Sequence, residues 1–296
     1  MTVTVERDSP AVTESAIKVQ DLQMTYGSQE VLKGVDLDIR RGEVYTLLGP
    51  NGAGKSTTIE IMEGFRRRSG GTVEVLGEDP DKAGAEWRAR IGIVVQSWRD
   101  HPRWRVGELL RHFSRYYRNP RDTDELLEVV GLTAEADRDC RLLSGGQRRR
   151  LDVALGIVGR PELLFLDEPT TGFDPVARRD FHVLVEKLNR EEGMTILLTT
   201  HDLAEAERLA HRVGILIGGE MRSAGTIDEL AAAVKTRAEV TWSERGERRT
   251  EVTADPSEVV WRLHRIFDGP IPDLEVRRPT LEDTYLRMIQ LENDRD

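Results

Sequence analysis

A glycine-rich segment with one lysine is the clearest chemical signal in the chain. "LLGPNGAGKSTT" has the spacing G-x-x-x-x-G-K-S/T and stands between an apolar run and helical residues. Glycines let backbone N–H groups converge on phosphate oxygens, and the next helix N-terminus adds partial positive charge. A nucleoside-triphosphate site follows, with the lysine on the β- and γ-phosphates and the serine on Mg²⁺. The alternative is a turn with a solvated lysine. The phosphate loop comprises Gly49, Pro50, Asn51, Gly52, Ala53, Gly54, Lys55, Ser56 and Thr57.

Two carboxylates at a strand end supply a second set of candidates. "LLFLDEP" carries Asp167 and Glu168 directly after an apolar run. In open α/β sheets, ligands bind at the carboxyl ends of strands. Asp167 can hold Mg²⁺ directly or through water, and Glu168 can polarise an attacking water as general base. The alternative is a solvated Asp-Glu pair that caps the next element.

The segment "LSGGQ" (143–147) raises a separate question. Ser144, Gly145 and Gly146 resemble the start of a helix built to receive an anion, although Lys55 lies far upstream. Its alternative is a flexible turn ahead of a helix. Residues 143–147 are called the signature segment below.

The elements that must position these residues are short apolar runs alternating with helices. Such runs are typical of parallel strands covered on both faces, and therefore of an α/β layer fold. Two more exposed stretches, 17–26 and 70–78, predict an antiparallel side sheet. The apolar runs are "VYTLLG" (44–49), "IGIVVQ" (91–96), "LLFLD" (163–167) and "TILLTT" (195–200).

Changes in polarity and in hydrophobic pattern along the chain predict three domains or segments. Residues 1–15 are polar and predict a loose tail, and residues 16–235 form the α/β domain, with an inserted helical lobe at about 97–160. Residues 236–296 predict a small C-terminal α+β domain. Caps are expected at Asp174 and Thr226.

Composition narrows the function classes. The chain has 296 residues, a net charge of −10 and one cysteine, Cys140. The negative net charge argues against a dedicated nucleic-acid binder, and the single cysteine fits a reducing compartment. No apolar run reaches the length of a membrane span, so we expect a soluble chain. The arginine runs 66–68 and 148–150 predict solvated faces.

With "GPNGAGKST", "LSGGQ" and "LLFLDEP" in this order, residues 17 to 230 resemble the ATP-binding subunit of ABC transporters. The resemblance implies a P-loop NTPase core, ATP and Mg²⁺. Gln96 corresponds to a glutamine on Mg²⁺ or its water, His201 to a γ-phosphate contact, and Tyr26 to an aromatic that stacks on adenine. Each also has a structural alternative: a polar strand end for Gln96, a helix lead-in for His201, strand packing for Tyr26.

The same resemblance implies partners. Two copies would pack head to tail, each placing Ser144, Gly145, Gly146 and Gln147 against the ATP of the other. Hydrolysis would open the dimer, and the helical lobe would carry the motion to a separate transmembrane permease. This chain would lie peripherally at the cytoplasmic face of the cell membrane. Membrane contact would run through the permease alone, near segment 97–108, whose "WRVGE" departs from the family's usual wording.

The C-terminal "RRPTLEDTYLRM" (277–288) resembles the ending of the drug-resistance exporter branch. It favours an ATPase that energises export of drugs or other small hydrophobic molecules. An importer ATPase shares all the phosphate chemistry and stays open as an alternative. A further alternative is a soluble ABC protein of translation or DNA repair, although those relatives carry paired cassettes or long coiled coils.

Overall fold

The computed structural model describes residues 14–95, 103–234 and 237–293. The chain divides into two compact units. The first runs up to Asp202 and includes Leu209–Arg222, and the second comprises Leu203–Arg208 and Ser223–Asp296. The predicted boundary at residue 235 stays a prediction.

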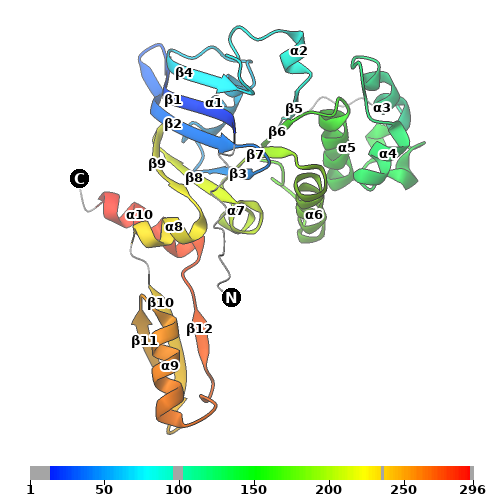
Figure 1. The fold of residues 1–296 in the computed structure, drawn as a ribbon. Helices are drawn as coiled ribbons and strands as arrows, with labels where there is room; N and C mark the ends of the chain where they lie inside the picture. Colours follow the sequence, from blue (N-terminus) through cyan, green and yellow to red (C-terminus); the bar gives the residue numbers. More distant parts are fainter. Residues whose placement is uncertain (1–13, 96–102, 235–236, 294–296) are drawn as a thin grey trace, which may run out of the picture. The chain divides into compact units, whose positions relative to one another are not determined.

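The first unit is built on a six-stranded sheet in the order β5-β6-β7-β3-β8-β9 (Figure 1). All four predicted apolar runs are strands of it, and the β3–β7, β3–β8, β5–β6 and β6–β7 pairs are parallel. The strands are β3 (Val44–Leu48), β5 (Ile91–Val94), β6 (Leu163–Asp167), β7 (Thr195–Thr200), β8 (Arg212–Ile217) and β9 (Glu220–Gly225).

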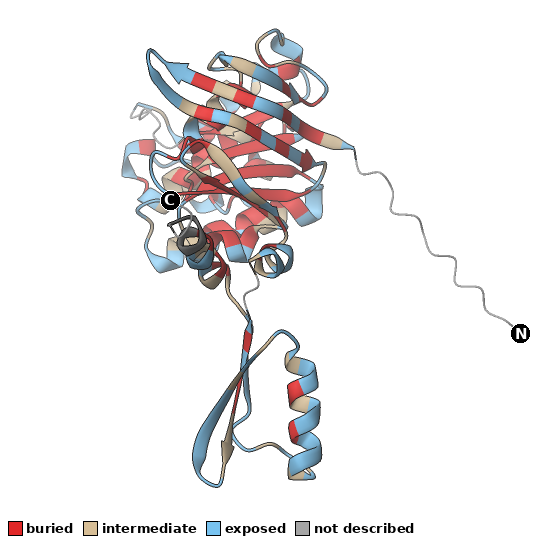
Figure 2. Cartoon of the chain, turned by 90° about the vertical axis from the view of Figure 1, so that its left-hand side faces the viewer, coloured by how far each residue is buried: buried red, intermediate tan, exposed pale blue. Residues whose placement is uncertain are grey.

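Both faces of this sheet are buried. Along β6, Leu164 and Leu166 enter one apolar cluster, whereas Leu163 and Phe165 enter the other. Helices α5 (Gly145–Ile157) and α6 (Pro175–Glu192) contribute to the first cluster, and α1 (Lys55–Met62) to the second. Side chains alternate across a strand, so covering both faces explains why these runs lack polar alternation. Figure 2 shows the resulting core as buried strands.

An antiparallel side sheet completes the second cluster, as predicted. Its order is β2-β1-β4, formed by β1 (Ser15–Tyr26), β2 (Gln29–Arg40) and β4 (Gly70–Val75). The sequence prediction did not include β2, although its buried residues Val35, Leu37 and Ile39 alternate with exposed ones. A short α2 (Ala85–Arg88) precedes β5.

The helical lobe holds α3 (Val106–Ser114), α4 (Thr123–Val129), two short 3₁₀ turns (Thr133–Glu135 and Cys140–Leu142) and α5. Ser144 caps α5 because its hydroxyl accepts from the Gln147 N–H, while the Gln147 side chain accepts from the Ser144 N–H. Asp174 caps α6 and Pro175 opens it, as predicted.

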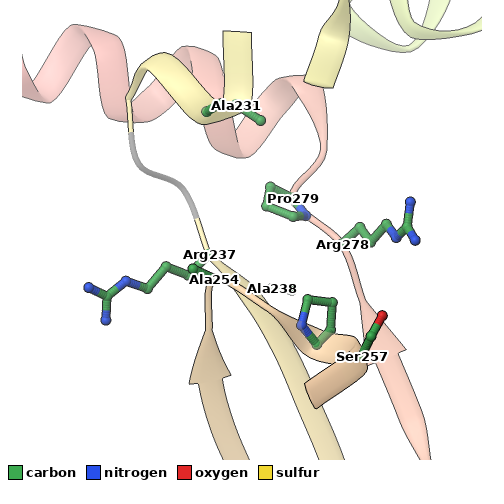
Figure 3. A pocket seen from close by; sticks show the side chains of 9 residues that line it. Ala231, Arg237, Ala238, Ala254, Ser257, Arg278 and Pro279 are labelled. Atoms are coloured by element: carbon green, nitrogen blue, oxygen red, sulfur yellow. The ribbon is translucent and has the colours of Figure 1, made fainter. Parts of the chain in front are cut away.

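The second unit includes α8 (Ile227–Ala233), which Thr226 caps as predicted, and a three-stranded sheet in the order β11-β10-β12. Val240, Val259 and Leu263 form its small core, and α9 buries one face (Figure 2). This unit holds a cavity of about 560 Å³, lined by alanines, serine, prolines and two arginines. In Figure 3 the Arg237 and Arg278 side chains extend to opposite sides. The other elements are β10 (Ala238–Glu244), β11 (Glu247–Thr253), α9 (Pro256–Phe267), β12 (Glu275–Arg277), α10 (Leu281–Asn293) and α7 (Leu203–Leu209).

Candidate functional site

The phosphate loop connects β3 to α1 at the carboxyl end of the sheet. Glycine is required at two of its positions. A Cβ on Gly49 would lie 2.2 Å from the Leu216 carbonyl oxygen, and Gly54 has a left-handed φ of +103°. These constraints explain why the sequence places glycines where the backbone must turn tightly into a helix.

Lys55 lies inside this loop and is buried. Its ammonium donates to the Gly49 carbonyl at 2.7 Å and to the Pro50 carbonyl at 3.2 Å. It also pairs with Glu168 Oε1 at 3.3 Å. The lysine and the strand-end carboxylate, predicted from separate motifs, therefore meet directly.

Asp167 ends β6 and joins two hydroxyls. Thr199 Oγ1, from the neighbouring β7, donates to Asp167 Oδ1 at 2.6 Å, and Ser56 Oγ donates to the same oxygen at 3.4 Å. Asp167 and Thr199 are register partners in the parallel ladder, so the sheet itself fixes this pairing. The sequence analysis did not single out Thr199, because "TILLTT" was interpreted as an apolar strand.

Glu168 is surrounded by polar groups. Lys55 pairs with its Oε1. The other carboxylate oxygen, Oε2, lies 3.3 Å from His201 Nδ1 and accepts from Thr171 Oγ1 at 3.3 Å. Burial raises the pKa of the Glu168 carboxyl, but the Lys55 ammonium and then the His201 imidazole lower it by more. The net pKa therefore lies below its usual value, and the group is an ionised carboxylate at neutral pH.

The donor set fits Mg²⁺. Magnesium takes oxygen ligands and is usually bound through one or two carboxylates plus substrate phosphates. The Ser56 hydroxyl and the Asp167 carboxylate supply oxygen donors of this kind and share a hydrogen bond. In the described part of the chain, no cluster of three or more His, Cys, Asp or Glu side chains could hold a metal by itself. This pair is thus compatible with a nucleotide-borne magnesium.

Tyr26 is the last residue of β1, and 39% of it is exposed. The Arg66 guanidinium lies 5.1 Å from the centroid of its ring and also pairs with Glu60 at 2.6 Å. The ring is thus partly exposed and has a cation beside it that was not predicted from the sequence. Its stacking on adenine stays a prediction.

The signature segment lies at the exposed N-terminus of α5. Ser144 exchanges two hydrogen bonds with Gln147, and its carbonyl accepts from the Arg148 N–H at 2.8 Å. Gln147 also donates to Glu135 at 2.9 Å, and none of these described bonds reaches the phosphate loop. A Cβ on Gly146 would lie 3.0 Å from Ala177, whereas a Cβ on Gly145 would meet nothing within 4 Å. The fold of one chain therefore gives no steric reason for glycine at position 145.

Gln96 and residues 97–102, the first half of segment 97–108, lie outside the described residues. The prediction of solvated arginine runs was wrong at Arg149 and Arg68. Arg149 is buried, and Arg68 pairs with Asp79 and Asp81 at 2.9 Å each. Successive helical residues point about 100° apart, so the three arginines of run 148–150 on α5 cannot share one solvated face. Residues 66–68 are not helical, and the two aspartates account for the position of Arg68.

These features define a P-loop ATPase, and comparison with known proteins places the chain more closely. Residues 32–171 match the family model described as ABC transporter. The chain is 40% identical to a Nod factor export ATP-binding protein of Ralstonia nicotianae, over 72% of the chain and 68% of that protein. It is 34% identical to a daunorubicin resistance ATP-binding protein of Streptomyces coeruleorubidus, over 94% of the chain and 96% of that protein. The chain belongs to the ATP-binding subunits of ABC transporters, and it is an ATPase.

Solved structures agree with this assignment. An ATP-binding subunit of an ABC transporter superposes with a TM-score of 0.66 at 28% identity, over 74% of this chain and 93% of that one. A dimeric cassette bound to ADP and phosphate in a post-hydrolysis state gives a TM-score of 0.63 at 26% identity, over 71% and 98%. Among the described residues, no helix has the length and apolarity needed to cross a membrane.

Proposed function

We propose that two copies of this chain bind two ATP molecules between them, and that hydrolysis drives an exporter. The observation that carries the proposal is the distribution of the motifs. Lys55, Glu168 and His201 meet at one sheet edge. Ser144 and Gly145 of the signature segment are exposed, and the segment has no described bond to that group. A head-to-tail pair places each exposed segment on the nucleotide of the other copy.

Within one site, the phosphate loop and Lys55 bind the β- and γ-phosphates, and Tyr26 stacks on adenine. Lys55 already contacts Glu168, so incoming phosphate oxygens compete with that carboxylate for the ammonium. Loss of the pair frees Glu168 to accept a proton from the attacking water. His201 contacts the γ-phosphate, and Gln96 faces Mg²⁺ or its water.

Ser56, Asp167 and Gln96 are the residues that would hold Mg²⁺, which supplies positive charge at the phosphates when bound. The orientation of Asp167 is set by the chain itself. Asp167 is kept in place by Thr199 and Ser56, and that pairing fixes the direction of its carboxylate.

ATP-dependent association tests the dimer. Glu168→Gln keeps the phosphate contacts but removes the base, so the variant with ATP and Mg²⁺ should become a dimer by light scattering and hydrolyse at least about 100-fold more slowly. The Lys55→Ala, Glu168→Gln double variant is the matched control and should stay monomeric. A Glu168→Gln protein that remains monomeric at saturating ATP would contradict the proposal.

The partner is a separate transmembrane permease, which this chain meets at the cytoplasmic face of the membrane. The cargo is a drug or another small hydrophobic molecule. Relatives named for daunorubicin resistance and Nod factor export support this direction, and the first aligns over 94% of the chain, its C-terminal part included. Co-expression with its permease should lower the intracellular drug concentration, and Glu168→Gln should abolish that effect. Greater drug accumulation with the intact pair would indicate import.

A further inference from the structure

Arg149 makes an unusual set of contacts for a member of a charged run. It lies on α5 and only 7% of it is exposed. Its Nε donates to the Pro169 carbonyl at 3.0 Å, its Nη2 to the Asp167 carbonyl at 3.0 Å, and its Nη1 to the Val95 carbonyl at 2.5 Å. The planar guanidinium thus uses donors on all three of its nitrogens for backbone oxygens.

Two of these carbonyls flank Glu168. That residue has a φ of +41°, in the left-handed region that non-glycine residues seldom occupy. Such a conformation is strained for a residue with a Cβ and persists where surrounding contacts enforce it. Arg149 holds the peptide oxygens before and after Glu168, and Thr199 Oγ1 accepts from the Glu168 N–H at 3.0 Å.

We propose that Arg149 is a positioning residue for Glu168. By holding both flanking carbonyls, its guanidinium keeps Glu168 in the left-handed conformation that directs the carboxylate toward Lys55 and His201. The inference rests on the proposed role of Glu168 as general base. Arg149 itself does not touch the nucleotide and acts through the backbone of its neighbour.

The same side chain links the site to two other proposed surfaces. Arg149 belongs to the helix that begins at Ser144, which faces the nucleotide of the second copy. Val95, its third acceptor, directly precedes Gln96 and the segment expected near the permease. These three hydrogen bonds therefore connect α5 of the helical lobe to the backbone around Glu168 and to Val95.

Substitution of Arg149 tests the inference. Arg149→Met retains a long unbranched side chain but has no hydrogen-bond donors. It should lower kcat roughly tenfold or more and change the KM for ATP by no more than about twofold from the parental value. Arg149→Lys, which retains the charge and can reach fewer carbonyls, should give an intermediate kcat. Arg150→Met is the matched control, because Arg150 also donates to a backbone carbonyl, that of Gly131, but has no described contact with residues 167–169. Its kcat should equal that of the parent.

A double-variant cycle separates positioning from general damage. If Arg149 acts through Glu168, adding Arg149→Met to Glu168→Gln should leave the residual rate unchanged within about twofold. If the two substitutions instead lower the rate by factors that multiply in the double variant, Arg149 has an independent structural role and the inference is overturned. A parental kcat for Arg149→Met would overturn it as well. Should Arg149→Met fail to fold by circular dichroism, Arg149→Lys decides in its place. If Glu168→Gln alone hydrolyses at the parental rate, the base assignment fails instead.

Discussion

The Lys55 ammonium lies 3.3 Å from the Glu168 carboxylate, so the proposed phosphate ligand and the proposed base are ion-paired across the site. Their side chains are 5% and 12% exposed, which strengthens the attraction because little water screens it. ATP binding and activation of the base are therefore coupled through one ammonium group.

Lys55→Ala should reduce ATP affinity by roughly tenfold or more, because a charge-assisted contact to the phosphates is lost. The pKa of Glu168 should rise in the same variant, since the Lys55 ammonium is the largest cause lowering it. Calorimetric titration with a slowly hydrolysed ATP analogue measures the affinity. An unchanged dissociation constant would refute the role of this lysine.

Thr199→Val should lower kcat by about tenfold, because the hydroxyl both accepts from the Glu168 N–H and donates to Asp167. Thr195→Val on the same strand is the control. Thr195 Oγ1 accepts from the Gly42 N–H at 2.9 Å, at the opposite end of β7. Phosphate-release assays should show a slow Thr199 variant and a normal Thr195 variant, and equal kcat values would remove Thr199 from the mechanism.

Asp79→Asn should destabilise the protein at neutral pH and not in acid. The Arg68 hydrogen bonds lower the pKa of Asp79 to about 2. Because the pKa of Asp79 is lower in the folded than in the unfolded state, the ionised carboxylate stabilises the fold at pH values above the unfolded-state pKa of about 4. This contribution is lost as the pH falls from about 4 toward 2. Urea unfolding at pH 7 should show a loss of about 1 kcal/mol that shrinks in acid. A pH-independent difference between variant and parent would argue against this linkage.

The sequence predicted those parts of the site in which reactive residue types occur at a characteristic spacing next to an apolar strand. The glycines around Lys55 and the carboxylates after an apolar run identify a strand end, and parallel strands bring such ends together. Arg149 was missed because a run of like charges was interpreted as one surface. Its helical spacing to the buried Asp152 and Val153 was the available signal.

Thr199 was missed for a related reason. The run "TILLTT" shows an apolar strand, but not which neighbouring strand it pairs with or which residue is its register partner. Long-range pairing decides that Thr199 lies beside Asp167. The alternation in β2, by contrast, was present in the sequence and could have been used.

Mixed dimers test most directly whether each ATP site is completed by the second copy. Ser144→Arg should block the signature segment and Lys55→Ala the phosphate loop, so each variant alone should be inactive. A mixed dimer pairs one intact loop with one intact segment, so a 1:1 mixture should regain up to about a quarter of the parental ATPase rate. A mixture as inactive as its components, or a Ser144→Arg protein that hydrolyses ATP at the parental rate, would contradict the account.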